Sequence, residues 1–153
     1  MVRTKSWTYE TNLRWGQELE GELASTGLPG LGFGAPPEFG GKAGSWGPET
    51  LLLGATESCT LLTFLSLARR KGVQLSSYRS SAVGLLAGDA EGVIRFTEIT
   101  IRPVVQVKSE ADAETVRALF QDVPKRCFIS CSLKTEPRIE LTVEIASPLE
   151  GPR

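Results

Sequence analysis

The sequence contains no histidine among its 153 residues. This absence excludes the serine–histidine and cysteine–histidine pairs of nucleophilic enzymes, and it removes the commonest protein ligand for metal ions. Cysteine is also scarce: Cys59, Cys127 and Cys131 are the only three, and no Cys-x-x-Cys pair is present. That pattern is poor for a zinc site and unlike a secreted disulfide scaffold. Any chemistry must therefore rest on thiols, carboxylates, arginine or lysine.

An excess of charge of either sign is missing as well. The chain carries 17 basic and 18 acidic side chains, which gives no electrostatic reason to expect nucleic acid or an anionic membrane as a partner. No apolar signal core stands at the N-terminus, so we expect a soluble protein in the cytoplasm. The length suits one domain with its own core, and we predict a single domain over residues 1–153.

The longest apolar segment, residues 48–71, has the signals of a helix. Pro48 suits the first helical position, Glu49 lies in the first turn, and Gly72 is a natural stop. At 1.5 Å per residue the helix would be roughly 36 Å long. Its apolar residues do not keep to one stripe, which predicts a central helix buried nearly all round. Polar residues such as Glu57 interrupt the segment and argue against a membrane span.

Residues 1–47 combine strand patterns with a loop. Trp7, Tyr9, Leu13 and Trp15 alternate over residues 6–15, which predicts a half-buried strand that pairs with a second strand over residues 18–25. Residues 27–47 are rich in glycine and proline but retain apolar side chains. We therefore expect an ordered loop there, with one short strand at most.

The remainder of the chain predicts a hairpin, a second helix and a last strand. Residues 73–108 form the hairpin, with its turn at residues 88–92; Pro103 lacks an N–H, so its strand should lie at an edge or be bulged. Ser109 caps a helix over residues 109–133 that Pro124 breaks, and residues 137–146 alternate as a strand. Strands joined by short turns, with helices segregated from them, predict an α+β fold with antiparallel sheet.

Taken alone, the cysteines leave two interpretations open, inert packing or redox activity. Cys59 lies three turns into its helix, too far from the N-terminus to gain thiolate stabilisation, and is more typical of a packing residue. Cys127 follows Lys125 and Arg126 near a proline break, a better setting for a reactive thiol. The sequence assigns no role to Cys131.

A resemblance to a known family is carried by both cysteines. Pro48-Glu49, the spacing from Ala55 to Cys59, the helix ending Ala68-Arg-Arg-Lys-Gly72 and the later Cys127-x-Ile129-Ser130 segment resemble the OsmC/Ohr family over roughly residues 5–146. Phe128 stands where that family has proline. The resemblance implies an OsmC-like α+β fold, with antiparallel sheets around a long central helix. It also implies an intertwined homodimer with sites at the subunit interface.

The resemblance further implies a thiol-dependent peroxidase that reduces organic hydroperoxides. Hydrogen peroxide is a further candidate substrate, because some members of that family reduce it. Cys59 would be the peroxidatic thiol, oxidised to a sulfenic acid, and Cys127 would resolve it to a disulfide. An external dithiol, such as a lipoylated protein, would reduce that disulfide, and no bound cofactor or metal is expected. Glu49 matches the family's carboxylate, which holds the arginine that stabilises the thiolate.

The arginine of the family pattern is missing from both of its usual positions. The first turn offers Gln17, Glu18 and Glu20, and the loop before the helix offers Glu38. Arg14 and Lys42 are the nearest candidate cations. The ten residues of helix between Glu49 and Cys59 span about 15 Å, so Glu49 must act through an arginine or across the dimer.

Glu57 points about 200° around the helix from Cys59, and we expect it to pair with a basic group elsewhere in the dimer.

The missing arginine and Phe128 also support an alternative function, a non-catalytic OsmC-like protein that binds a small apolar ligand at the dimer interface. A structural domain with inert cysteines is the third interpretation.

Overall fold

A computed structural model describes residues 5–147 of the chain. The chain divides into two compact units, Met1–Leu51 and Leu52–Arg153, and each is described by itself. The single domain over residues 1–153 stays a prediction, and its two ends lie outside the described residues.

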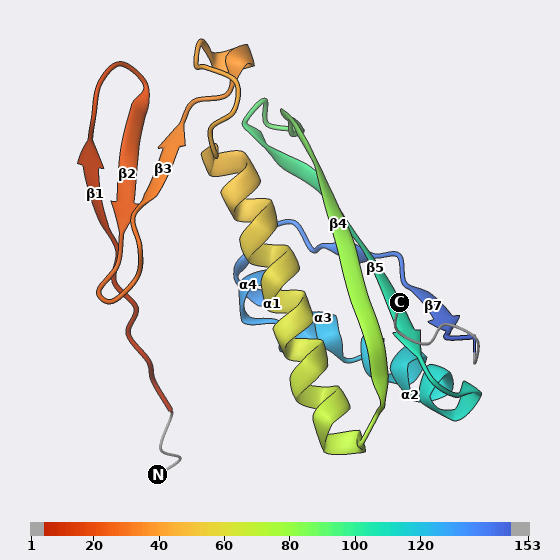
Figure 1. Ribbon diagram of the computed structural model, residues 1–153. Coiled ribbons are helices and arrows are strands. Elements are labelled where there is room, and N and C mark those ends of the chain that lie inside the picture. The colour runs from red at the N-terminus through yellow and green to blue at the C-terminus, as the bar shows by residue number, and fades with distance from the viewer. Residues whose placement is uncertain (1–4, 148–153) are drawn as a thin grey trace. The chain divides into compact units, whose positions relative to one another are not determined.

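The N-terminal unit is a three-stranded antiparallel sheet in the order β1-β2-β3. Its strands are β1 (Asn12–Trp15), β2 (Glu20–Ala24) and β3 (Leu31–Gly34), followed by the 3-10 turn η1 (Pro37–Phe39) (Figure 1). The expected hairpin and the short strand in the glycine-rich segment are both present. The half-buried first strand was wrong, because all four residues of β1 are exposed. Alternation predicts burial only where a second layer covers the strand, and within this unit none covers β1.

Helix α1 (Pro48–Lys71) has the predicted bounds. Gly72 adopts a left-handed conformation with φ of 68°, which glycine reaches without steric cost, and the Val73 N–H donates to the Ala68 carbonyl at 3.2 Å. These are the contacts of a helix that ends at glycine, as the sequence predicted.

The second sheet is mixed rather than antiparallel. Strands β4 (Leu75–Gly88) and β5 (Ile94–Val107) form the predicted antiparallel hairpin. The last strand splits into β6 (Arg138–Ile139) and β7 (Thr142–Ile145), and both pair with β5 in parallel. The expectation of a wholly antiparallel sheet is therefore wrong for these strands. The chain leaves β5 through helices and returns from the other end, a crossover that makes strands parallel.

Pro103 lies in the central strand of this sheet, so the prediction of an edge strand or a bulge was wrong. It pairs with Ser80 of β4 within a regular part of the register. On its other side β5 pairs with β6 up to Ile101 and with β7 from Val104. The proline thus stands opposite the gap between β6 and β7, where no ladder hydrogen bond needs its missing N–H.

The predicted second helix is three short helices: α2 (Glu110–Phe120), α3 (Val123–Arg126) and α4 (Phe128–Ser132). The Ser109 cap is present, since its Oγ accepts from the Asp112 N–H at 3.1 Å. Pro124 lies in the first turn of α3, where proline is tolerated, and the break precedes it. These breaks place Cys127 between α3 and α4.

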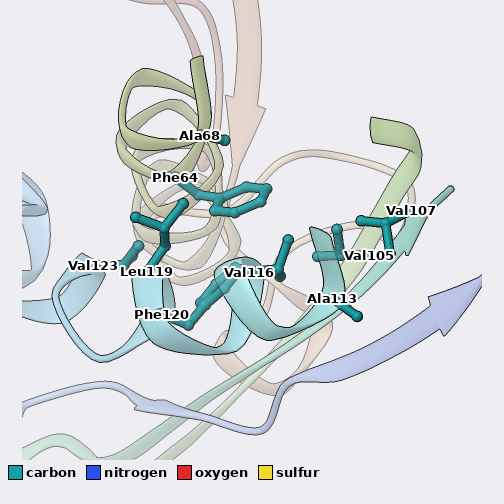
Figure 2. Close-up of a cluster of buried hydrophobic side chains, with 9 residues drawn as sticks. All are labelled: Phe64, Ala68, Val105, Val107, Ala113, Val116, Leu119, Phe120 and Val123. Atoms are coloured by element: carbon teal, nitrogen blue, oxygen red, sulfur yellow. The ribbon is translucent and has the colours of Figure 1, made fainter. Parts of the chain in front are cut away.

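The core of the C-terminal unit lies between α1, α2 and one face of the sheet. Figure 2 shows its side chains converging from these elements: Phe64, Ala68, Val105, Val107, Ala113, Val116, Leu119, Phe120 and Val123. The Phe64 ring stacks on Phe120 with centroids 4.7 Å apart and on Tyr78 of β4 at 6.1 Å. One aromatic side chain of α1 therefore joins both layers.

Helix α1 is less buried than the sequence predicted. Its buried residues are Thr56, Thr60, Phe64 and Ala68, one stripe at four-residue spacing. Burial nearly all round was wrong for the single chain, because the sheet and α2 cover only this stripe. By length and apolar composition alone, α1 could cross a membrane. Phe64 and Ala68 nevertheless contribute to the core, which identifies α1 as a core helix.

Candidate functional site

A pocket of about 450 Å³ lies beside the buried stripe of α1, within the C-terminal unit. Its wall combines one thiol, apolar side chains, small hydroxyls and two arginines. The lining residues are Cys59, Leu62, Thr63, Ser66, Leu67 and Arg70 of α1, Arg126 of α3 and Phe128 of α4. The α1 members follow the three- and four-residue spacing of one helical face, which presents Cys59 and Arg70 to the same hollow.

The structure brings Cys59 and Cys127 together. The Cys59 thiol is partly exposed in the pocket, whereas Cys127 is fully buried behind it. The two thiols lie close enough to influence each other's pKa, and the Ile129 backbone lies beside Cys59. Cys127 stands at the N-cap position of α4, and Ser130 of that helix lies beside its sulfur. The helix break that the sequence predicted is therefore what places the second sulfur against the first.

The two thiols have opposite pKa shifts. Burial raises the pKa of Cys59 above the usual 9.0, and the neighbouring Cys127 sulfur acts in the same direction. Burial alone would also raise the pKa of Cys127, but the polar groups of Ser130, Cys59 and Thr60 around its sulfur together hold it below its usual value. Of the two thiols, Cys127 therefore loses its proton more readily.

Glu57 and Cys131 face other surroundings. Glu57 turns toward the sheet and accepts a hydrogen bond from the Ser80 hydroxyl of β4. Its expected basic partner elsewhere in a dimer stays a prediction. Cys131 is exposed, and its thiol donates to the carbonyls of Pro124 and Lys125 at 3.6 and 3.5 Å. Across residues 5–147, no three His, Cys, Asp or Glu side chains gather to hold a metal ion.

Glu49 lies in the N-terminal unit beside a second hollow. This hollow, of about 400 Å³, is lined by aromatic and aliphatic side chains that include Trp15, Phe33 and Phe39. The Glu49 Oε2 atom is buried and has no hydrogen-bond partner among the described residues. It also lies only 2.8 Å from where a Cβ at Gly47 would stand, so the glycine permits this close approach. A buried carboxylate oxygen without a partner is an acceptor that a cation can satisfy.

The two cations considered from the sequence lie in the N-terminal unit and have carboxylate partners there. Arg14 donates to Glu22 at 3.1 Å. Lys42 lies 3.0 Å from Glu18 and 3.8 Å from Glu20, and the hydrogen bond to Glu18 raises its pKa. Within that unit, these acidic side chains of the first turn engage both candidates.

The sequence did not identify the two arginines in the wall of the Cys59 pocket as site residues. In the sequence Arg70 stands out only as part of the helix end at residues 68–72, although it lies eleven residues after Cys59, three helical turns along one face. Arg126 was noted beside Cys127 but not as a neighbour of Cys59. Helical spacing could have pointed to Arg70, whereas placing Arg126 required the fold.

Solved structures share this fold at low sequence identity. An OsmC-like protein of unknown function from Vibrio cholerae superposes with a TM-score of 0.81 at 22% identity, over 89% of this chain and 99% of that one. An organic hydroperoxide resistance protein from Elizabethkingia anophelis, with thiocyanate bound, gives 0.73 at 15% identity, over 93% and 99%. One from Legionella pneumophila gives 0.66 at 19% identity, over 92% and 99%. These similarities show the fold.

Comparison of sequences supplies the family. The chain is 27% identical to the uncharacterized protein YmaD of Bacillus subtilis over 118 residues, which is 76% of this chain and 77% of YmaD. The family model described as OsmC-like protein matches residues 40–142, which include α1, Cys59 and Cys127. The resemblance inferred from the two cysteines is confirmed, and the chain belongs to the OsmC-like protein family.

Proposed function

We propose that this protein is a thiol-dependent peroxidase that reduces organic hydroperoxides at Cys59. One observation carries the proposal: a thiol that faces a pocket lies beside a second, buried thiol. This is the arrangement that a peroxidatic and a resolving cysteine require. Family membership and the names of two structural neighbours, both organic hydroperoxide resistance proteins, support a role in hydroperoxide resistance.

The two neighbouring thiols suit a two-step reaction. Cys59 gives its proton to water, and its thiolate attacks the distal peroxide oxygen. The O–O bond breaks, Cys59 becomes a sulfenic acid, and the departing alkoxide takes the proton to leave as an alcohol. The Cys127 thiolate then attacks the Cys59 sulfur, forming the disulfide and releasing hydroxide. An external dithiol, such as a lipoylated protein, reduces that disulfide, so the cycle needs no bound cofactor.

Glu49 belongs to the proposal as the carboxylate that holds a cation. Its buried Oε2 lacks a partner among residues 5–147, as expected of a carboxylate whose role is to bind a guanidinium. Arg14 and Lys42, the candidates from the sequence, would have to leave Glu22 and Glu18 to serve it. Both of those ion pairs are exposed and weak, so the exchange is energetically feasible.

The proposal includes a homodimer. Leu62 and Leu65 of α1 are 65% and 36% exposed, and Val83 and Leu85 of β4 are 54% and 51% exposed. A second copy that covers α1 would bury the apolar side chains that the single chain leaves in water. A cytoplasmic location stays a prediction.

The raised pKa of Cys59 favours a second candidate function. A thiol that keeps its proton is a poor nucleophile, so the same pocket would also suit a non-catalytic protein that binds a small apolar ligand. The two functions differ in whether Cys59 is oxidised during turnover.

Turnover of cumene hydroperoxide with a dithiol such as dihydrolipoamide tests the proposal. We expect the wild-type protein and Cys131→Ser to consume peroxide, Cys59→Ser to be inactive, and Cys127→Ser to accumulate sulfenic acid. Non-reducing mass spectrometry after one equivalent of peroxide should show a Cys59–Cys127 disulfide. Equal inactivity of wild type and Cys59→Ser, without a disulfide, would overturn the peroxidase and leave the binding protein.

A further inference from the structure

Arg70 and Arg126 stand apart from most arginines of this chain. Among residues 5–147, the arginines with a carboxylate within ion-pair distance are Arg14, Arg79, Arg95, Arg102, Arg117 and Arg138. Within the same range, Arg69, Arg70 and Arg126 have none, and all three lie near the C-terminal ends of α1 and α3. Two of these three line the Cys59 pocket. Cations without protein counterions in one pocket wall favour an anionic ligand there.

The rest of the wall is apolar. Leu62, Leu67 and Phe128 lie between or beside the two arginines and the thiol. Phe128 is 75% exposed, so the wall presents an aromatic surface to solvent. Both the volume, about 450 Å³, and the mixture of apolar walls with a few polar groups are typical of small-molecule sites.

Helix geometry separates Arg70 from the reacting sulfur. Its Cα lies about 16 Å farther along α1 than that of Cys59, and helical side chains lean toward the N-terminus by only part of that distance. The Arg70 guanidinium therefore belongs to the far end of the pocket. A charge there is remote from the thiolate but well placed for the distal end of an elongated substrate.

We propose that Arg70 and Arg126 bind the carboxylate of an organic hydroperoxide whose apolar body lies along Leu62, Leu67 and Phe128 and whose peroxide group reaches Cys59. This inference rests on the proposed peroxidase and adds a specificity determinant to it. Guanidinium groups bind carboxylates through two parallel N–H···O bonds, which lysine cannot reproduce. Arg69 and Lys125 are matched controls, because they adjoin Arg70 and Arg126 in sequence and do not line the pocket.

Binding without turnover tests the carboxylate site. The probes are decanoate and its neutral analogue decanamide, titrated calorimetrically into Cys59→Ser, which cannot react. We expect decanoate to bind tighter than decanamide. Arg70→Gln and Arg126→Gln, each added to Cys59→Ser, should weaken decanoate binding by about tenfold to a hundredfold and leave decanamide unchanged. Arg69→Gln and Lys125→Gln should bind both probes as the parent does. Absent decanoate binding, equal affinity for the two probes, or equal effects in the controls would overturn the proposal.

Kinetics separate this inference from the proposed function. In the otherwise wild-type protein, Arg70→Gln should raise KM for a hydroperoxide with a terminal carboxylate and leave KM for its methyl ester unchanged. Arg69→Gln, which does not alter the pocket lining, should retain the wild-type rate with cumene hydroperoxide. Turnover of cumene hydroperoxide with no preference for the acid over the ester would overturn the carboxylate site alone. Inactivity with every hydroperoxide, despite selective decanoate binding, would overturn the peroxidase and reduce the arginines to a carboxylate-binding site.

Discussion

Two faces of α1 lie side by side and differ in what covers them. The buried face comprises Thr56, Thr60, Phe64 and Ala68; the pocket face comprises Cys59, Leu62, Thr63, Ser66, Leu67 and Arg70. Their centres are about 110° apart around the helix. Both faces mix apolar and polar residues, so apolar content alone does not tell which one the fold covers.

Hydrogen bonding explains how threonines occupy the buried face. The Thr56 hydroxyl donates to the Leu52 carbonyl at 2.8 Å, and the Thr60 hydroxyl donates to the Thr56 carbonyl at 2.9 Å. Each satisfies its hydroxyl within the helix, so burial costs little. The pocket face instead leaves Leu62 65% exposed beside a partly exposed thiol. One helix thus supplies stability on one side and a reactive surface on the other.

The largest expected effect is on stability and separates the two faces directly. Phe64→Ala should lower the free energy of unfolding by about 3–5 kcal/mol, because the ring is fully buried and stacks on Phe120 and Tyr78. Leu62→Ala, two residues earlier, should change the stability of the single chain, where Leu62 is 65% exposed, by no more than about 0.5 kcal/mol. Urea denaturation followed by circular dichroism measures both. Comparable losses would mean that the pocket face is also covered, as a tight dimer would cover it.

The sequence predicted the helix, the hairpin and the family, but not which face of α1 is buried. The bounds of α1 follow from local signals, Pro48 at the first position and Gly72 after the last. The parallel pairing of β6 and β7 and the central place of Pro103 depend on contacts remote in sequence, which local patterns do not encode. The same limit applied at the site. Two cysteines were identified from spacing, whereas the arginines beside Cys59 come from α1 and α3, which only the folded chain brings together.

The second expected effect is on the pH dependence of thiol alkylation, which compares Cys59 on the pocket face with the buried Cys127 and the exposed Cys131. Because the pKa of Cys59 is raised, less thiolate is present at pH 7–9 than in a free thiol, whose pKa is 9.0. Its rate of alkylation by iodoacetamide should therefore rise about tenfold per pH unit and still be rising above pH 9.

Peptide mapping by mass spectrometry resolves the sites in the same sample. Cys131, which is exposed, gives the reference rate, and Cys127, which is fully buried, should stay unmodified until the protein unfolds. A plateau of the Cys59 rate below pH 8 would show that a cation stabilises its thiolate in solution, contrary to the shift found here.

A smaller effect should come from the helix that covers the buried face. Ser109→Ala removes the cap of α2 and should cost about 1 kcal/mol of stability. Ser109→Asp, which can still cap, should retain most of that stability and is the matched control. Phe120 of α2 packs in the core against the buried face of α1. Loss of the cap should therefore leave the alkylation rate of Cys59, which lies on the pocket face, unchanged. A faster Cys59 reaction would show that α2 also supports the pocket face.

The smallest expected effect lies where the two faces meet. Thr60 belongs to the buried face, yet its hydroxyl also lies beside the Cys127 sulfur and lowers the pKa of that thiol. Thr60→Val keeps the shape and should change stability by about 1 kcal/mol or less. It should also move the ultraviolet titration of Cys127 to higher pH.

Thr56→Val is the matched control, one turn earlier, with the same hydrogen bond to the fourth preceding carbonyl but no part in the pKa shift of Cys127. If both variants shift the titration equally, the threonines act through helix geometry alone. If only Thr60→Val does so, the buried face tunes the resolving thiol directly. Thr60 would then contribute both to the stability of the core and to the chemistry of the thiol pair.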